Sequence, residues 1–184
     1  WTLFAIFAYL FAALQTGLAP VIALEGRFGP IVPRFDFVLV VFVGLFAAPR
    51  PTMVAWAAMG LLIDLAMPAH VGGVTLIGPY TIGFLFGGFA VLQLRTLVLR
   101  THPLSLAFCT VAAGLAVQLV VVLIFTIRSW YDPPFADYSA VADLTTRAFG
   151  LLYTAIFALL LAFPLVRMVP AFGLQLSRHA SRRM

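Results

Sequence analysis

Charged side chains are scarce in this sequence. Only 9% of the 184 residues are Asp, Glu, Lys or Arg, whereas 64% are hydrophobic, and the mean hydropathy is +1.11. A chain this apolar has too few polar side chains to cover the surface of a soluble fold. Lysine is absent, and the basic residues are 11 arginines scattered among apolar runs. The net charge of +5 therefore indicates orientation in a membrane, and the lack of a basic cluster argues against nucleic-acid binding.

Residues that usually carry catalysis or metal binding are few and dispersed. Cys109 is the single cysteine, so neither a disulfide nor a thiolate metal cluster can form within one chain. His70, His102 and His179 lie in separate loops or tails, without a second ligand at metal-binding spacing. No serine has the context of a nucleophile elbow, and Gly72-Gly73 lacks the lysine of a phosphate-binding loop. We therefore expect no enzyme activity, no cofactor and no metal site.

Six apolar segments dominate the chain. A helix needs roughly 20 mostly apolar residues, within a range of about 17 to 25, to cross a hydrocarbon core of about 30 Å. Pro49, Arg50 and Pro51 separate the second and third segments and predict a tight turn. We expect one all-α domain over 1–184, a bundle of six transmembrane helices with a cytoplasmic tail at 175–184. The first is interpreted as a retained helix, with a cleaved signal peptide as the alternative. The expected helices cover 1–23, 35–48, 52–67, 76–94, 104–127 and 148–169.

The arginines also predict the orientation. Because cytoplasmic loops of membrane proteins carry an excess of basic residues, the more basic side is expected inside, with both termini in the cytoplasm. Trp130, Tyr131 and Tyr138 cluster where the fifth helix should leave the bilayer, as aromatic anchors do. The loop over 128–147 leaves two alternatives open, a short helix on the outer surface or a solvated loop. Seven arginines (50, 95, 100, 167, 178, 182 and 183) fall on the inner side and four (27, 34, 128 and 147) on the outer side.

Asp64 is the one ionisable residue deep within an apolar run. A charged Asp at the centre of a transmembrane helix costs about 2.5 to 3.5 kcal/mol, so its presence there requires a reason. One interpretation is functional, a proton or substrate site. The other, which we favour, is an interfacial carboxylate that caps or tethers the loop over 68–75, since Pro68 begins a turn only a few residues later.

Small residues line the expected fourth helix. Gly83 and Gly87 form a GxxxG spacing, and Gly88 follows directly. Small residues on one face let two helix backbones approach closely, and the partner is either a helix of this chain or a helix of another protein. Gln15 and Gln118 are interpreted as packing contacts between helices, because interhelical hydrogen bonds average about 0.6 kcal/mol.

One segment resembles a known family. The run Gly60-Leu-Leu-Ile-Asp64-Leu-Ala-Met-Pro68, followed by Gly72-Gly73 and an apolar helix ending at Arg95, is similar to the rod shape-determining protein MreD family. The short second helix after Pro33-Arg34-Phe35-Asp36 and the Pro-Arg-Pro hairpin extend the resemblance to most of the chain. In that family a helix ending in Gly-x-x-x-Asp precedes a glycine-containing turn. The resemblance also implies a fold similar to the S components of energy-coupling-factor transporters, which are small six-helix proteins.

The resemblance implies a function in recognition. It predicts a non-catalytic subunit of the cell-elongation machinery in the bacterial cytoplasmic membrane. The implied partners are MreC and, through it, the RodA glycosyltransferase with its class B penicillin-binding transpeptidase. The outer loops and the small-residue face of the fourth helix with Gly83 and Gly87 are expected to contact them. The alternative is an S component that binds a vitamin or metal in an outward-facing pocket, for which Asp64, His70, Thr75 and Tyr80 are the candidates.

Overall fold

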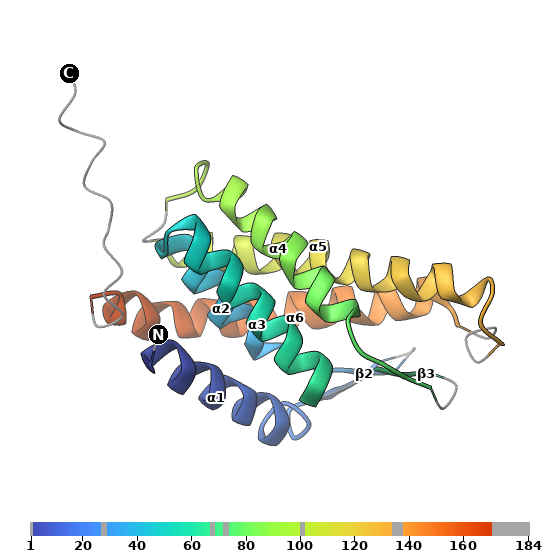
Figure 1. The fold of residues 1–184 in the computed structure, drawn as a ribbon. Coiled ribbons are helices and arrows are strands. Elements are labelled where there is room, and N and C mark those ends of the chain that lie inside the picture. Colours follow the sequence, from blue (N-terminus) through green and yellow to red (C-terminus); the bar gives the residue numbers. More distant parts are fainter. Residues whose placement is uncertain are drawn as a thin grey trace.

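Six helices make up most of the chain (Figure 1). The computed structural model describes residues 2–26, 29–66, 69–71, 74–99, 102–133 and 138–170. The helices are α1 (Thr2–Gly17), α2 (Phe35–Phe46), α3 (Pro49–Ala66), α4 (Pro79–Leu94), α5 (Pro103–Ser129) and α6 (Ala140–Met168). Two short antiparallel hairpins pair β1 (Leu24–Gly26) with β2 (Gly29–Ile31) and β3 (Ala69–Val71) with β4 (Val74–Leu76). The predicted all-α class is confirmed, and the hairpins add to it.

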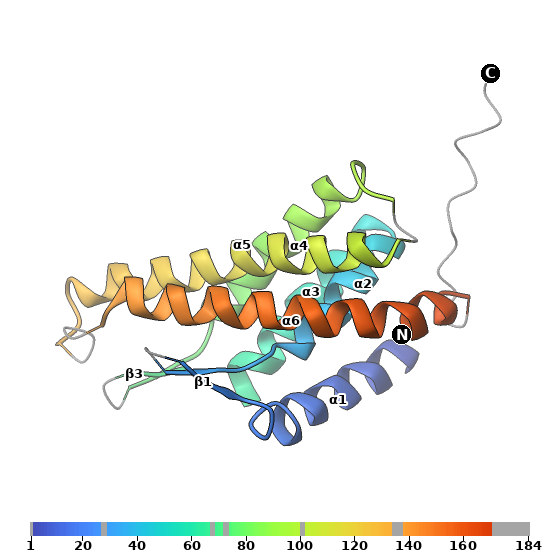
Figure 2. The same cartoon turned by 180° about the vertical axis from the view of Figure 1, so that it is seen from behind.

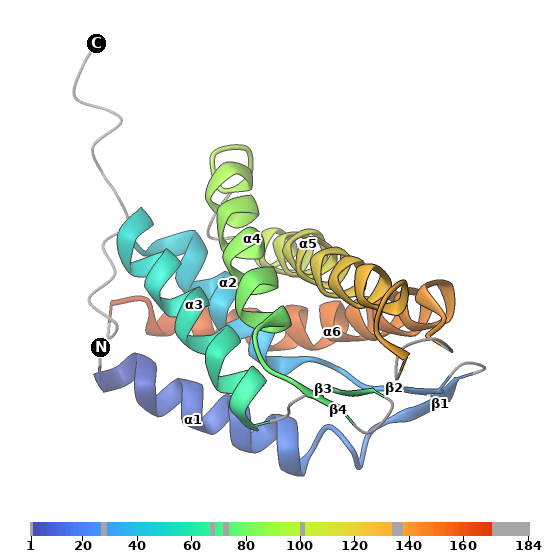
Figure 3. The ribbon, with the colours of Figure 1, turned by 45° about the vertical axis from the view of Figure 1, so that its right-hand side comes forward.

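Consecutive helices run in opposite directions, so the connections gather at two ends of the bundle. Both hairpins and the turn between α5 and α6 lie together at one end, here called the hairpin end (Figures 2 and 3). The start of α1, the α2–α3 turn and the end of α6 lie at the opposite end. The start of the first helix and the end of the last helix therefore lie at the same end of the bundle.

The core of the molecule is α2. All 12 of its residues are buried, and it packs against α1, α3, α4, α5 and α6. A helix that is hydrophobic all round belongs in the interior, and this one meets that expectation. At 1.5 Å per residue it is about 18 Å long, well short of a hydrocarbon core of about 30 Å. The segment expected to form the second span is therefore an internal helix that the others enclose.

Prolines and strands explain where the helix boundaries differ from the expected ones. The first helix ends at Gly17 instead of residue 23, because Pro20 follows and the chain then pairs as β1. The third begins at Pro49 instead of residue 52, since proline is accommodated in a first helical turn, where its missing N–H has no partner to lose. The fourth begins at Pro79 instead of residue 76, because residues 74–76 form β4.

The segment over 140–147 differs from both structures considered for it, a short surface helix and a solvated loop. The last helix starts at Ala140 instead of residue 148, and Ser139 caps it by accepting a hydrogen bond from the Ala142 N–H. Residues 140–147 are therefore neither a separate surface helix nor a loop. They form the first two turns of α6 and carry its polar residues into the bundle.

Among the described helices, α5 and α6 are long and apolar enough to cross a membrane. Large apolar side chains lie exposed along the outer face of the bundle. In a water-soluble protein, a helix would bury side chains of this kind. Both observations associate these helices with a membrane. The exposed side chains include Ile82, Phe86 and Phe89 on α4 and Phe149, Leu152, Ile156, Leu160 and Phe163 on α6.

Candidate functional site

Polar and charged side chains from four helices converge at the hairpin end. We call this group the hairpin-end cluster. Arg34 and Asp36 come from the start of α2, Tyr80 from the start of α4, and Gln118 from α5. Tyr138, Asp143 and Arg147 come from the start of α6 and the residues just before it.

Arg147 is the hub of the cluster. Its Nε donates to Asp143 Oδ1 over 2.7 Å, and its Nη1 donates to Gln118 Oε1 over 2.6 Å and to the Tyr80 hydroxyl over 2.9 Å. The Tyr138 hydroxyl donates to the second oxygen of Asp143 over 2.6 Å. Burial and this hydrogen bond raise the pKa of the Tyr138 phenol, so it stays a donor at neutral pH. One guanidinium group thus links α4, α5 and α6.

Arg34 forms the second charged centre. Its Nε and Nη2 donate to the two oxygens of Asp36 over 3.0 and 2.7 Å, a bidentate pair, while its backbone N–H donates to Thr154 on α6. The guanidinium carbon lies 5.2 Å from the centre of the Phe37 ring and 5.3 Å from that of Tyr80. Burial alone would lower the pKa of Arg34, but the Asp36 carboxylate raises it above its usual value. Arg34 is therefore charged.

A pocket of about 230 Å³ lies among these groups. Its position at the hairpin end and its convergent polar groups are typical of a small-molecule site. The polar side chains that line it are Arg34, Tyr80, Gln118, Asp143, Thr146 and Arg147.

Asp64 accepts hydrogen bonds from the start of α4, the helix that carries the pocket residue Tyr80. Its Oδ1 accepts a hydrogen bond from the Tyr80 N–H over 3.1 Å, and its Oδ2 accepts from the N–H and hydroxyl of Thr81 over 2.8 and 2.6 Å. These N–H groups belong to the first turn of α4, where backbone N–H groups have no acceptor within the helix. The helix dipole also favours a negative charge at this position. The carboxylate is fully buried. Asp64 therefore tethers α3 to the start of α4 and holds Tyr80 in place; the loop over 68–75 that it was expected to cap or tether lies largely outside the described residues.

The glycines of α4 pack inside the chain. A Cβ added at Gly83 would meet the Val117 carbonyl oxygen of α5 at 3.0 Å. One added at Gly87 would meet Val117 and Trp56 side-chain carbons at 2.6 Å, and one added at Gly88 would meet Trp56 of α3 at 2.9 Å. The close approach predicted for this face occurs with α3 and α5. The expected contact of the same glycines with a partner protein is replaced by packing within the molecule.

The other predicted site residues divide into two groups. Pro68, Gly72 and Gly73 lie outside the residues that the structure describes. His70 and Thr75 are register partners in the β3–β4 hairpin, and their side chains lie outside the described part as well. Of the four residues expected to bind a ligand in an S component, Tyr80 lines the pocket.

The sequence did not identify Arg34, Gln118 and Arg147 as members of one site. Two local signals were present. Asp143 and Arg147 have the i,i+4 spacing of a helical ion pair, and Arg34 precedes a carboxylate by two residues at the start of a helix. Neither signal says that the two pairs meet, because that depends on how α2, α4, α5 and α6 pack.

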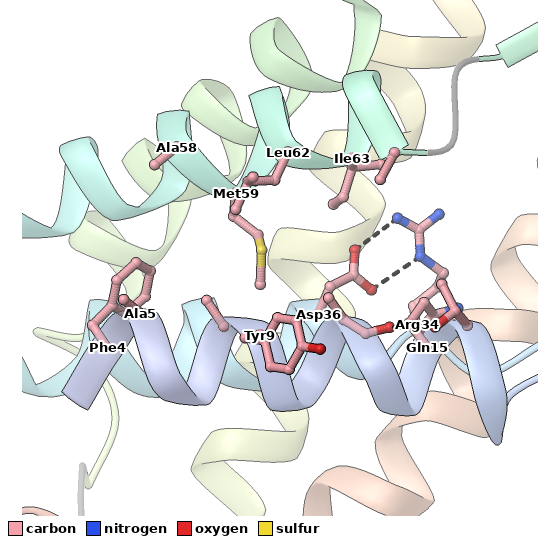
Figure 4. Close-up of a pocket in the computed structure, with 14 residues that line it drawn as sticks. Phe4, Ala5, Tyr9, Gln15, Arg34, Asp36, Ala58, Met59, Leu62 and Ile63 are labelled. Carbon is pink, nitrogen blue, oxygen red and sulfur yellow. Dashed lines mark hydrogen bonds and ion pairs between the residues drawn. The ribbon is translucent and has the colours of Figure 1, made fainter. Parts of the chain in front are cut away.

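A second cavity lies between α1 and α3 (Figure 4). It is a groove of about 430 Å³ with mostly apolar walls, including Phe4, Met59 and Leu62. Figure 4 shows the Arg34–Asp36 pair at one end of this groove, so Arg34 lines both cavities.

Comparison with known proteins leaves the chain without an assigned family. A scan against protein-family models finds no matching model, and searches of curated proteins and of solved structures find no match. Within the described residues, no group of three or more His, Cys, Asp or Glu side chains is placed to hold a metal ion.

Proposed function

We propose that this chain is a multi-pass subunit of the bacterial cytoplasmic membrane that acts by binding other proteins and catalyses no reaction. The observation that carries the membrane assignment is the distribution of polarity. Leu160 and Phe163 on the outer face of α6 are 64% and 62% exposed, whereas the Asp64 carboxylate is 0% exposed. Apolar side chains outside and paired charges inside are what a hydrocarbon solvent requires.

The helix lengths support a bundle that spans the bilayer around α2. With 27 and 29 residues, α5 and α6 are about 40 Å long, and α1, α3 and α4 are each about 24 to 27 Å long. In the proposed topology all six helices alternate in direction, α1, α3, α4, α5 and α6 face lipid, and α2 runs back through the enclosed centre of the bundle.

The arginine distribution supports an orientation with the hairpin end outside. Arg50 and Arg95 lie at the opposite end, and the Arg95 Nη1 donates to the carbonyl of Ala47 at the C-terminus of α2 over 2.7 Å. A cation at this position complements the helix dipole. The proposed cytoplasmic side is therefore the more basic one.

The assignment to cell elongation rests on the resemblance to the MreD family. The segment that carries it forms the joint between α3 and α4. A Cβ at Gly60 would lie 2.7 Å from the Thr81 Cα, and Asp64 binds the first turn of α4. The Gly-x-x-x-Asp motif thus has a physical role, since the glycine lets α4 approach and the aspartate sets where it begins. The proposed partners are an MreC-like protein, a RodA-type glycosyltransferase and a class B penicillin-binding protein, with contacts through the loops at the hairpin end.

The test is extraction of the tagged protein from its native cells in a mild detergent, followed by mass spectrometry of the proteins that co-purify. An untagged strain is the control. Recovery of a periplasmic coiled-coil protein with peptidoglycan synthases is the expected result. Recovery of cytoplasmic ATPases with a coupling membrane subunit would instead indicate an S component, the alternative that the pocket at the hairpin end favours. Recovery of neither set would contradict both functions.

The topology is tested separately. A reporter that is active only in the cytoplasm is expected to be active when fused after residues 48 and 98. A reporter that is active only outside the membrane is expected to be active when fused within 130–138. The opposite pattern would overturn the orientation while leaving the fold unaffected.

A further inference from the structure

Two guanidinium groups line one small cavity at the hairpin end. The guanidinium carbons of Arg34 and Arg147 lie 5.3 and 5.9 Å from the centre of the Tyr80 ring, and both side chains line the pocket of about 230 Å³. Asp143 is the one acidic residue in that lining, since Asp36 pairs with Arg34 from the side of the other cavity. Two like charges in a poorly solvated space repel each other. Asp36 and Asp143 each pair with one of these guanidinium groups, so the lining can offer an anion only the N–H donors that these pairs leave over.

The described hydrogen bonds leave donors of this pocket unused. A guanidinium group has five N–H donors. Arg34 uses Nε and Nη2 on Asp36, and Arg147 uses Nε and Nη1 on Asp143, Tyr80 and Gln118. These bonds leave Nη2 of Arg147 unengaged, and Arg34, which also bonds to Tyr80, keeps N–H groups beyond those that it directs at Asp36 and Tyr80. Gln118 accepts through its oxygen, so its amide nitrogen keeps two more donors for the same space.

We propose that this pocket binds an oxyanion, a phosphate or carboxylate group, between Arg34 and Arg147. Guanidinium groups recognise such anions through paired N–H···O bonds, and the amide of Gln118 adds a neutral donor. The volume is several times the roughly 30 Å³ of one water molecule, so the pocket also accommodates a substituent on the anion.

A lipid headgroup and a soluble anion share this chemistry. In the proposed topology the pocket lies at the outer ends of α2 and α4, the depth of the headgroups, and Arg34 also lines the apolar groove between α1 and α3. Both sources are therefore tested. The inference does not depend on which proteins co-purify with this chain, so it stands or falls separately from the elongation function.

The variant that tests the site is Thr146→Glu. Thr146 lines the pocket, and its hydroxyl bonds only to the carbonyl of Ala142 among the described residues, so the arginine contacts remain. The new carboxylate would occupy the anion position from within the chain. Thr145→Glu is the matched control, because it adds the same charge one residue away on a partly exposed position outside the pocket.

The experiment measures the thermal unfolding midpoint of the full chain in dodecyl maltoside micelles, which contain no phosphate. One arm adds inorganic phosphate, against chloride at equal ionic strength. The other adds phosphatidylglycerol to the micelles. An anion at ten times its dissociation constant raises the ratio of folded to unfolded protein about 11-fold, an increase of about 3 to 6 °C in Tm for a chain of this length.

The expected result is an increase in Tm for the wild type and for Thr145→Glu that Thr146→Glu loses. An increase with inorganic phosphate identifies a soluble anion, and an increase with phosphatidylglycerol alone identifies a headgroup. No increase in either arm would overturn the inference, as would an increase that Thr146→Glu retains. If Thr146→Glu does not fold, the shorter Thr146→Asp takes its place, and the wild-type arms remain decisive alone.

Discussion

Replacing Asp64 by asparagine is expected to destabilise the fold, although the side chain keeps its size. The Asp64 carboxylate accepts three hydrogen bonds, from the Tyr80 N–H and from the N–H and hydroxyl of Thr81. Asparagine has one acceptor oxygen, and its NH₂ group would face a backbone N–H. At least one donor in the first turn of α4 is then left without a partner in a buried site.

The magnitude follows from two contributions. A buried donor without a partner costs about 1 to 3 kcal/mol. Loss of the negative charge at the start of α4 removes up to about 2 kcal/mol of favourable interaction with the helix dipole in a buried geometry. Together they predict a loss of about 1 to 5 kcal/mol in the free energy of unfolding. If Asp64 were instead a proton or substrate site, neutralising it would relieve an unfavourable buried charge and stabilise the chain.

The assay is denaturant-induced unfolding in detergent micelles, followed by circular dichroism. Asp132→Asn is the matched control, because Asp132 lies 3.6 Å from Arg128 in a partly exposed ion pair that contributes at most about 1 kcal/mol. The cap assignment would be refuted if Asp64→Asn were as stable as Asp132→Asn, or more stable than the wild type.

Three further substitutions test the packing and the charges. Gly87→Leu is expected to cost about 1 to 3 kcal/mol through overpacking against Trp56, measured by the same unfolding assay, whereas Phe86→Leu on the exposed face of α4 should have little effect. Trp56→Phe is expected to stay within about 1 kcal/mol of the wild type, because the buried Trp56 Nε1 has no hydrogen-bond partner among the described residues and its removal offsets lost packing; a loss above about 3 kcal/mol would argue against that environment. Arg34→Met is expected to cost about 3 to 5 kcal/mol by leaving Asp36 unpaired, and the double variant Arg34→Met/Asp36→Leu should recover most of it. A double variant less stable than the single one would show that the pair itself stabilises the fold.

Several features of the fold were predictable because they depend on local composition. Long uncharged runs such as 104–127 predict helices, and α5 covers that range with small extensions at both ends. The three-residue strands were not predicted, because segments this short carry no period that separates them from a loop. The start of α6 was misplaced since residues 140–147 are polar, although Ser139 is a residue type favoured at helix N-termini.

The composition and the order of apolar segments determined on their own that the chain is helical and too apolar for a water-soluble surface. Tertiary structure alone decided that α2 is enclosed, that the glycines of α4 contact α3 and α5, and that Tyr80, Gln118 and Arg147 meet. The physical reason is range. Helix formation depends on neighbours within a few residues, whereas the partner of a buried charge lies on another helix, at a distance in sequence that no local pattern encodes.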